Sequence, residues 1–216
     1  MLKQEVADFL RKVRHNTTIE AQIRDIDSYE ELSELSNAEG IQATATEFRE
    51  AFIERNARTM LELMLQQGVI EPTPLTPLGP IDENQWSRIA AIDLAPVVTQ
   101  MVRDQEWSQA RAASAERRYR RFLYLKTILP DGNASPTHEV DQFWHQHIIN
   151  TRKYGPDCEK AVGHFLHHSF LSPEEEADAA TLRAIWLDTQ AAYEALFEEP
   201  YEGTIGAALL DRWPEA

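Results

Sequence analysis

The sequence predicts an all-α protein, built from a small N-terminal three-helix module and a larger helical-bundle domain. Apolar residues recur at spacings of three and four through most of the chain, which is the period of an amphipathic helix. No segment alternates between apolar and polar residues for long enough to predict a strand. A proline-rich stretch at 68–83 predicts a linker, so we expect the module at 1–67 and the domain at 84–216.

The N-terminal module shows three helical segments with their own start and stop signals. The first covers residues 2–14, where the apolar side chains form one stripe. Two capping-box pairs, in which a Ser or Thr is followed three residues later by Glu, start the next two helices: Ser28 with Glu31, and Thr44 with Glu47. Gly40 is expected to end the second helix, and the third should run to about Gln67.

The larger domain is expected to contain further helices separated by turn residues. Proline should interrupt the first segment near Pro96, and the Gly155–Pro156 pair should break the chain between two later helices. A proline in the first turn marks the last, long helix. The expected segments are 86–101, 107–129, one beginning at Ser135–Pro136, Cys158–His168, and one beginning at Ser172–Pro173.

Composition excludes several classes of protein. The chain has 216 residues and a formal net charge of -15 at pH 7, which argues against general binding of nucleic acid or anionic membranes because both need a basic face. Neither a secretory signal nor a stretch of about 20 apolar residues is present. The single cysteine, Cys158, cannot form an internal disulfide. We therefore expect a soluble, cytoplasmic protein with no nucleic-acid or membrane partner.

Histidines are concentrated in one short segment. Six of the seven fall between positions 138 and 168: His138, His145, His147, His164, His167 and His168. On a helix, Asp141 and His145 lie one above the other, and His164 and His168 repeat this spacing on the following helix. Two facing helices would present both pairs to one point, which is how helical proteins build metal sites.

The ligand types leave the metal open among several ions. Imidazole with one carboxylate suits zinc, iron(II), copper(II) or nickel, whereas calcium needs more acidic ligands. Two histidines and one aspartate with open positions would favour iron(II) oxygen chemistry, and a closed set of four would favour structural zinc. The alternatives are a buried polar network of histidines, or a dispersed and solvated set. Cys158 fits either a soft ligand or a buried apolar residue.

Two parts of the chain resemble known families. Val6–Asn16, Ser28–Ile41 and Thr44–Phe52 resemble the leader-peptide family of nitrogen-fixation type, related to nitrile-hydratase leaders. Such leaders are recognised by enzymes that modify ribosomally made peptides. Glu139–His168 is similar to the helical domain of bacterial glycine-rich-domain-containing proteins. That resemblance favours Asp141, His145 and His168 as ligands over His138 and His167.

Together these features predict a metal-dependent protein of ribosomal peptide natural-product biosynthesis. Whether it is an enzyme is left open by the sequence; if it is one, we expect catalysis to depend on the metal. Its partners would be peptide-modifying enzymes or a peptide substrate. Asp141, His145, His164 and His168 would hold a divalent iron, zinc or copper ion, while His147 and Tyr154 would shape the open side or transfer protons. The alternatives are a non-catalytic helical scaffold with a buried histidine network, and a leader-bearing substrate protein modified by partner enzymes.

Overall fold

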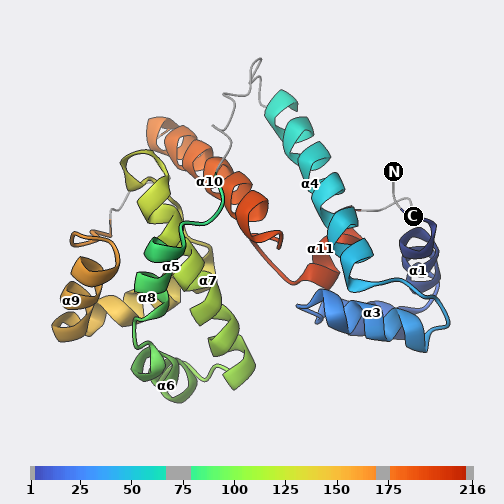
Figure 1. Ribbon diagram of the computed structural model, residues 1–216, viewed down its shortest axis with the longest axis horizontal. Coiled ribbons are helices and arrows are strands. Elements are labelled where there is room, and N and C mark those ends of the chain that lie inside the picture. Colours follow the sequence, from blue (N-terminus) through green and yellow to red (C-terminus); the bar gives the residue numbers. More distant parts are fainter. Residues whose placement is uncertain (1–2, 67–78, 169–175, 213–216) are drawn as a thin grey trace. The chain divides into compact units, whose positions relative to one another are not determined.

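The computed structural model describes residues 3–66, 79–168 and 176–212. Over these residues the chain forms eleven α-helices, one short 3-10 helix and no strand (Figure 1), which confirms the all-α class. The contacts divide the chain into two compact units. Unit 1 consists of Met1–Leu78 with Glu194–Ala216, and unit 2 consists of Gly79–Tyr193.

Unit 1 is built around helices whose starts the sequence predicts well. Both capping boxes form: Ser28 Oγ accepts from Glu31 N at 3.1 Å, and Thr44 Oγ1 accepts from Glu47 N at 3.2 Å. Gly40 follows the second of the predicted helices with a φ of +80°, the left-handed conformation that commonly ends a helix. The helices before the linker are α1 (Gln4–Arg14), α2 (Thr17–Arg24), α3 (Tyr29–Ala38) and α4 (Ala45–Gln66).

The segment 1–67 thus contains four helices rather than the three that we predicted. The additional one, α2, begins after Asn16, whose side-chain oxygen accepts from Thr18 N and Ile19 N. Its only buried residues are Ile19 and Ile23. A helix of eight residues with two buried apolar side chains gives only a weak periodic pattern. The capping residue Asn16 was the one local signal that could have indicated its start.

A helix from the C-terminal end completes the core of unit 1. Helix α11 (Ile205–Arg212) contacts α2 and α4, and Ile205, Leu209 and Leu210 are buried in the same cluster as the apolar faces of the earlier helices. The contact is close because a Cβ at Gly206 would collide with the carbonyl oxygen of Ile23. The structure therefore groups the end of the chain with the N-terminal helices, whereas we expected 84–216 as one domain. Amphipathic patterns do not reveal which helix covers which.

Unit 2 is organised around α7 (Gln109–Ile128), the helix that contacts α5, α6 and α8. Its buried side chains include Tyr119 and Phe122, both without measurable exposure, and Ser108 caps its start. The other elements are α5 (Glu83–Ala90), α6 (Ala95–Asp104), the 3-10 turn η1 (Pro130–Gly132), α8 (His138–Ile149), α9 (Thr151–Ala161) and the greater part of α10 (Glu176–Phe197). The Ser135 amide joins α10 to this unit by donating to Thr189 Oγ1 at 3.0 Å.

Helix α9 corrects two predictions about the histidine segment. It passes through Gly155–Pro156 instead of breaking there, because Tyr154, Asp157, Cys158 and Ala161 bury one face and this packing outweighs one missing backbone hydrogen bond. It then ends at Ala161, and Gly163 has a φ of +92°. The residues that follow are non-helical up to position 168. The predicted helical pairing of His164 with His168 therefore does not form.

Part of the predicted linker and the predicted helix start at Ser172–Pro173 lie outside the described residues. Among the helices that the structure does describe, none combines the length and the apolar character that crossing a membrane requires.

Candidate metal centre

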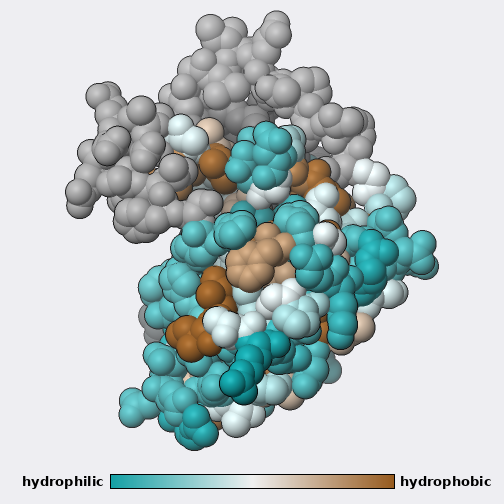
Figure 2. Space-filling view, turned by 90° about the vertical axis from the view of Figure 1, so that its left-hand side faces the viewer, coloured by the Kyte–Doolittle hydropathy of each residue, from teal (hydrophilic) through white to brown (hydrophobic). Residues whose placement is uncertain are grey.

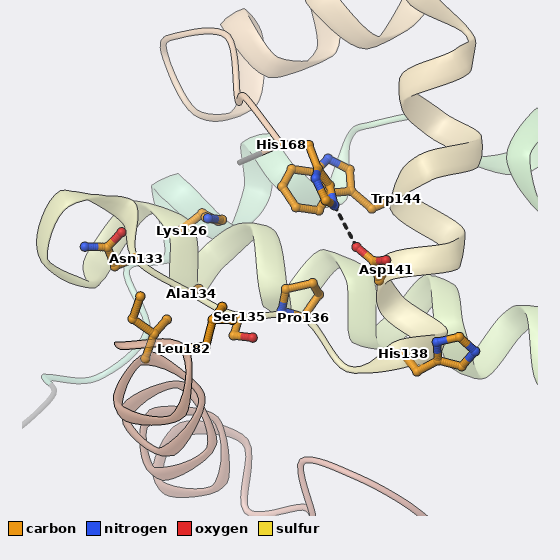
Figure 3. A pocket seen from close by; sticks show the side chains of 11 residues that line it. Lys126, Asn133, Ala134, Ser135, Pro136, His138, Asp141, Trp144, His168 and Leu182 are labelled. Atoms are coloured by element: carbon orange, nitrogen blue, oxygen red, sulfur yellow. Dashed lines mark hydrogen bonds and ion pairs between the residues drawn. The ribbon is translucent and has the colours of Figure 1, made fainter. Parts of the chain in front are cut away.

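Three side chains with metal-ligand chemistry meet at the surface of unit 2. Asp141, His145 and His168 each direct one ligand atom into a space in which all three atoms lie within 4.8 Å of one another. His168 Nε2 is 2.8 Å from Asp141 Oδ1, and His145 Nδ1 is 3.6 Å from Asp141 Oδ2. Figure 3 shows the contact between Asp141 and His168. It is the only such group of three or more residues in the part of the chain that the structure describes.

Helix geometry explains two members of this group. Asp141 and His145 are four residues apart on α8, which begins after Thr137, whose hydroxyl accepts from Val140 N. A spacing of four places both side chains on one face of the helix. The opposite face, including Phe143 and His147, is buried against the rest of unit 2, so the pair remains accessible on the solvent side. The side chain of His145 is 51% exposed and that of Asp141 is 29% exposed.

His168 comes from the non-helical segment after α9, and a buried hydrogen-bonded chain holds that segment against α8. Trp144 Nε1 donates to Tyr154 Oη at 2.9 Å, and Tyr154 Oη donates to the Leu166 carbonyl oxygen at 2.6 Å. The indole of Trp144 also lies against the His168 ring, with centroids 4.7 Å apart. Trp144 and Tyr154 thus fix both the backbone just before His168 and the face of its imidazole.

His147 and Tyr154, which we predicted on the open side of the site, lie in the interior instead. Each is 1% exposed, and neither lines the cavity that adjoins Asp141 and His168. Tyr119 Oη is 3.0 Å from His147 Nδ1, and His147 Nε2 is 3.2 Å from Asp157 Oδ2. Because the carboxylate can only accept, Nε2 carries the proton and Nδ1 accepts from the tyrosine. Burial lowers the pKa of His147, which agrees with this neutral form.

The remaining residues of the histidine segment are dispersed. His164 is exposed and does not belong to the ligand group, because α9 ends before it. His138 lines the cavity beside the site, and His167 packs against Phe165 with ring centroids 4.8 Å apart. Cys158 is buried, and burial raises the pKa of its thiol. A thiol of that kind is a packing residue rather than a ligand.

The chemistry of the three ligands suits a transition metal. Bonds from a metal to imidazole nitrogen and carboxylate oxygen are roughly 2.0–2.2 Å long, so ligand atoms around one ion are roughly 3 Å apart. The two separations from Asp141, 2.8 and 3.6 Å, are close to this value, and all three ligand atoms lie within 4.8 Å of one another. Three protein ligands leave coordination positions open for water or substrate, as in catalytic metal sites and unlike closed structural ones. Two histidines and one carboxylate are also the set that non-haem iron(II) sites use.

A cavity of about 330 Å³ adjoins this group (Figure 3). Asp141 and His168 form part of its wall, together with Trp144, whose ring lies against that of His168. Other wall residues come from the end of α7, from the loop after η1 and from α10. A small molecule in the cavity would therefore lie beside the ligand atoms.

Comparison with known proteins corrects both resemblances that we inferred from the sequence. Neither a nitrile-hydratase-type leader nor a glycine-rich-domain family was detected, so both identifications were wrong. The leader resemblance rested on amphipathic helices of ordinary composition, a pattern that many helical proteins share. The expected role in peptide biosynthesis depended on it, and no feature of the described residues supports that role.

One family model does match the chain. It is described as UCP032817-like and covers residues 85–197, which includes the three candidate ligands and the buried residues that position them. A comparison with curated proteins and one with solved structures found no match. Since the matched segment is more than half of the 216 residues, the chain belongs to the UCP032817-like family.

Proposed function

We propose that unit 2 is a metal-binding domain in which Asp141, His145 and His168 hold one divalent transition metal and leave part of its coordination sphere open. The observation that carries the proposal is the meeting of three ligand atoms, from two imidazoles and one carboxylate, within 4.8 Å. Iron(II) is the first candidate for this ligand set, and zinc is the second. An open ion of either kind can polarise a bound molecule, so the proposal includes metal-dependent catalysis.

The supports of the ligands favour a built site over a chance cluster. Metal-binding side chains are usually held in orientation by neighbouring hydrogen bonds and packing. Here the buried hydrogen bonds run from Trp144 Nε1 to Tyr154 Oη and from Tyr154 Oη to the Leu166 carbonyl oxygen. These hydrogen bonds fix the segment that carries His168. Because this segment is not helical, helix geometry does not determine where His168 lies. Such precise placement of an accessible imidazole is what a metal site requires.

A second candidate is a non-catalytic helical module, and one observation favours it. The 2.8 Å contact between Asp141 and His168 is also what an ordinary ion pair would produce. Figure 2 shows one face of the protein, which is mostly hydrophilic with hydrophobic residues in separate patches. An ion pair needs only two of the three side chains, whereas His145 also directs a ligand atom into the same space. We therefore place metal binding first.

Thermal unfolding with and without metal separates these two candidates. The protein, purified without an affinity His-tag, is stripped with a chelator and melted alone and then with iron(II) under nitrogen, or with zinc. A ligand at about 100 times its Kd stabilises the folded state by roughly 2.7 kcal/mol, which corresponds to a rise in Tm of roughly 5–10 °C for a domain of this size. Asp141→Asn should abolish the rise, because the amide is a poor ligand and cannot balance the charge of the ion.

The melting experiment has a clear adverse result. If the Tm of the stripped wild-type protein does not change with either metal, or if Asp141→Asn shows the same rise as the wild type, the ion pair alone explains the geometry and the proposal fails. An unchanged Tm would favour the non-catalytic module.

A further inference from the structure

The cavity beside the ligand group contains a charge that its surroundings do not balance. Lys126, near the end of α7, lines the cavity. Its ammonium group lies 5.5 Å from the centroid of the Phe122 ring and 5.7 Å from that of Trp144. Among the described residues, none gives it a hydrogen bond or an ion pair. This is unusual in a chain with a net charge of -15, where acidic side chains are abundant.

The ammonium group of Lys126 loses part of its hydration by burial and has no charged partner among the described residues in exchange. The Lys126 side chain is only partly exposed, and loss of solvent lowers its pKa. Contact with aromatic faces recovers a part of the lost hydration, whereas an anion in the cavity would recover more. Of the described residues that line the cavity, Lys126 alone has a full positive charge and Asp141 alone a negative one. Asp141 is already engaged with both candidate histidine ligands.

The cavity has polar groups on two sides and apolar side chains in its wall. Figure 3 shows Lys126 and Asn133 on one side and the Asp141–His168 pair on the other. Trp144 connects the two sides, because its ring lies against both the ammonium of Lys126 and the imidazole of His168. Leu182 and Ile185 of α10 add apolar wall. A pocket with apolar walls and a few polar groups at defined places is typical of small-molecule sites.

We propose that this cavity, beside the metal site, binds a small organic carboxylate, whose anionic group pairs with Lys126 while its apolar part lies against Trp144, Leu182 and Ile185. The inference rests on the proposed metal site for its functional meaning, since it names the substrate class of that site. The pairing itself involves only Lys126 and the ligand, and so it does not require the metal. The 330 Å³ volume restricts the ligand to a small molecule.

Calorimetric titration with a matched pair of probes tests the charge. Benzoate and its neutral analogue benzamide are titrated into the zinc-loaded and the metal-free wild-type protein. We expect benzoate to bind both forms, and to bind at least about tenfold more tightly than benzamide. Lys126→Met, which keeps the length of the side chain, should reduce benzoate affinity by about tenfold or more and leave benzamide affinity unchanged. Lys126→Arg should restore most of the benzoate affinity.

Lys160→Met is the matched control, because it makes the same charge change on an exposed part of α9. It should bind benzoate as the wild type does. The inference is overturned if benzoate does not bind, if benzamide binds equally well, or if Lys126→Met leaves benzoate affinity unchanged. Its failure is distinct from that of the proposed function, because zinc affinity is measured in the same proteins: benzoate binding without zinc binding would overturn the metal site alone.

Discussion

His168→Ala is expected to lower the affinity of the protein for its metal by at least about 100-fold. Loss of residues that only support a ligand already costs about 10- to 100-fold, and His168 is one of three ligands in the proposed site. Among the described residues, the group contains no further His, Cys, Asp or Glu that could replace it. Competition with a chromophoric chelator measures the affinity.

His164→Ala is the control for this variant. Both histidines follow the end of α9, both are exposed, and both were predicted as ligands from the sequence. The structure includes only His168 in the group, so His164→Ala should bind metal as the wild type does. Equal losses in the two variants, or a loss confined to His164, would contradict the ligand assignment.

Tyr154→Phe should reduce both stability and metal affinity. The variant removes the hydroxyl that accepts from Trp144 Nε1 and donates to the Leu166 carbonyl, and leaves two buried polar groups without that partner. Each unsatisfied group costs about 1–3 kcal/mol, so we expect about 2–6 kcal/mol of lost stability in chemical denaturation. Release of the segment before His168 should also lower metal affinity by about tenfold.

Tyr119→Phe separates positioning from general destabilisation. Tyr119 is as buried as Tyr154, but its hydroxyl contacts His147 and not the segment that carries His168. This variant leaves one buried group, His147 Nδ1, without that partner, so it should lose about 1–3 kcal/mol of stability and keep its metal affinity. If both variants bind metal equally well, the hydrogen-bonded chain through Tyr154 has only a structural role.

The capping boxes predicted two helix starts accurately because capping chemistry lies within a few residues of the helix. The start expected at Ser135–Pro136 was two residues too early, because Thr137 caps α8. Ser28 and Thr44 cap as expected, and the spacing of Asp141 and His145 placed both on one face of α8. These features depend on regular helix geometry, which the sequence determines directly.

The features that were not predictable depend on tertiary contacts. His168 reaches Asp141 from a non-helical segment, and its position depends on the buried chain through Tyr154, to which no periodic pattern points. His147 is buried between Tyr119 and Asp157, which are 28 and 10 residues away from it in the sequence. The same holds for Lys126, whose approach to Trp144 depends on the packing of α7 against α8.

Metal stoichiometry tests the central claim most directly. Protein without an affinity His-tag is reconstituted with iron(II) under nitrogen or with zinc, freed of unbound metal by gel filtration, and measured by elemental analysis. The wild type should retain about one ion per chain, and the triple variant Asp141→Asn, His145→Gln, His168→Gln should retain less than about a tenth of one. A wild type with less than about a tenth of an ion for both metals, or a triple variant that retains as much as the wild type, would contradict the metal site.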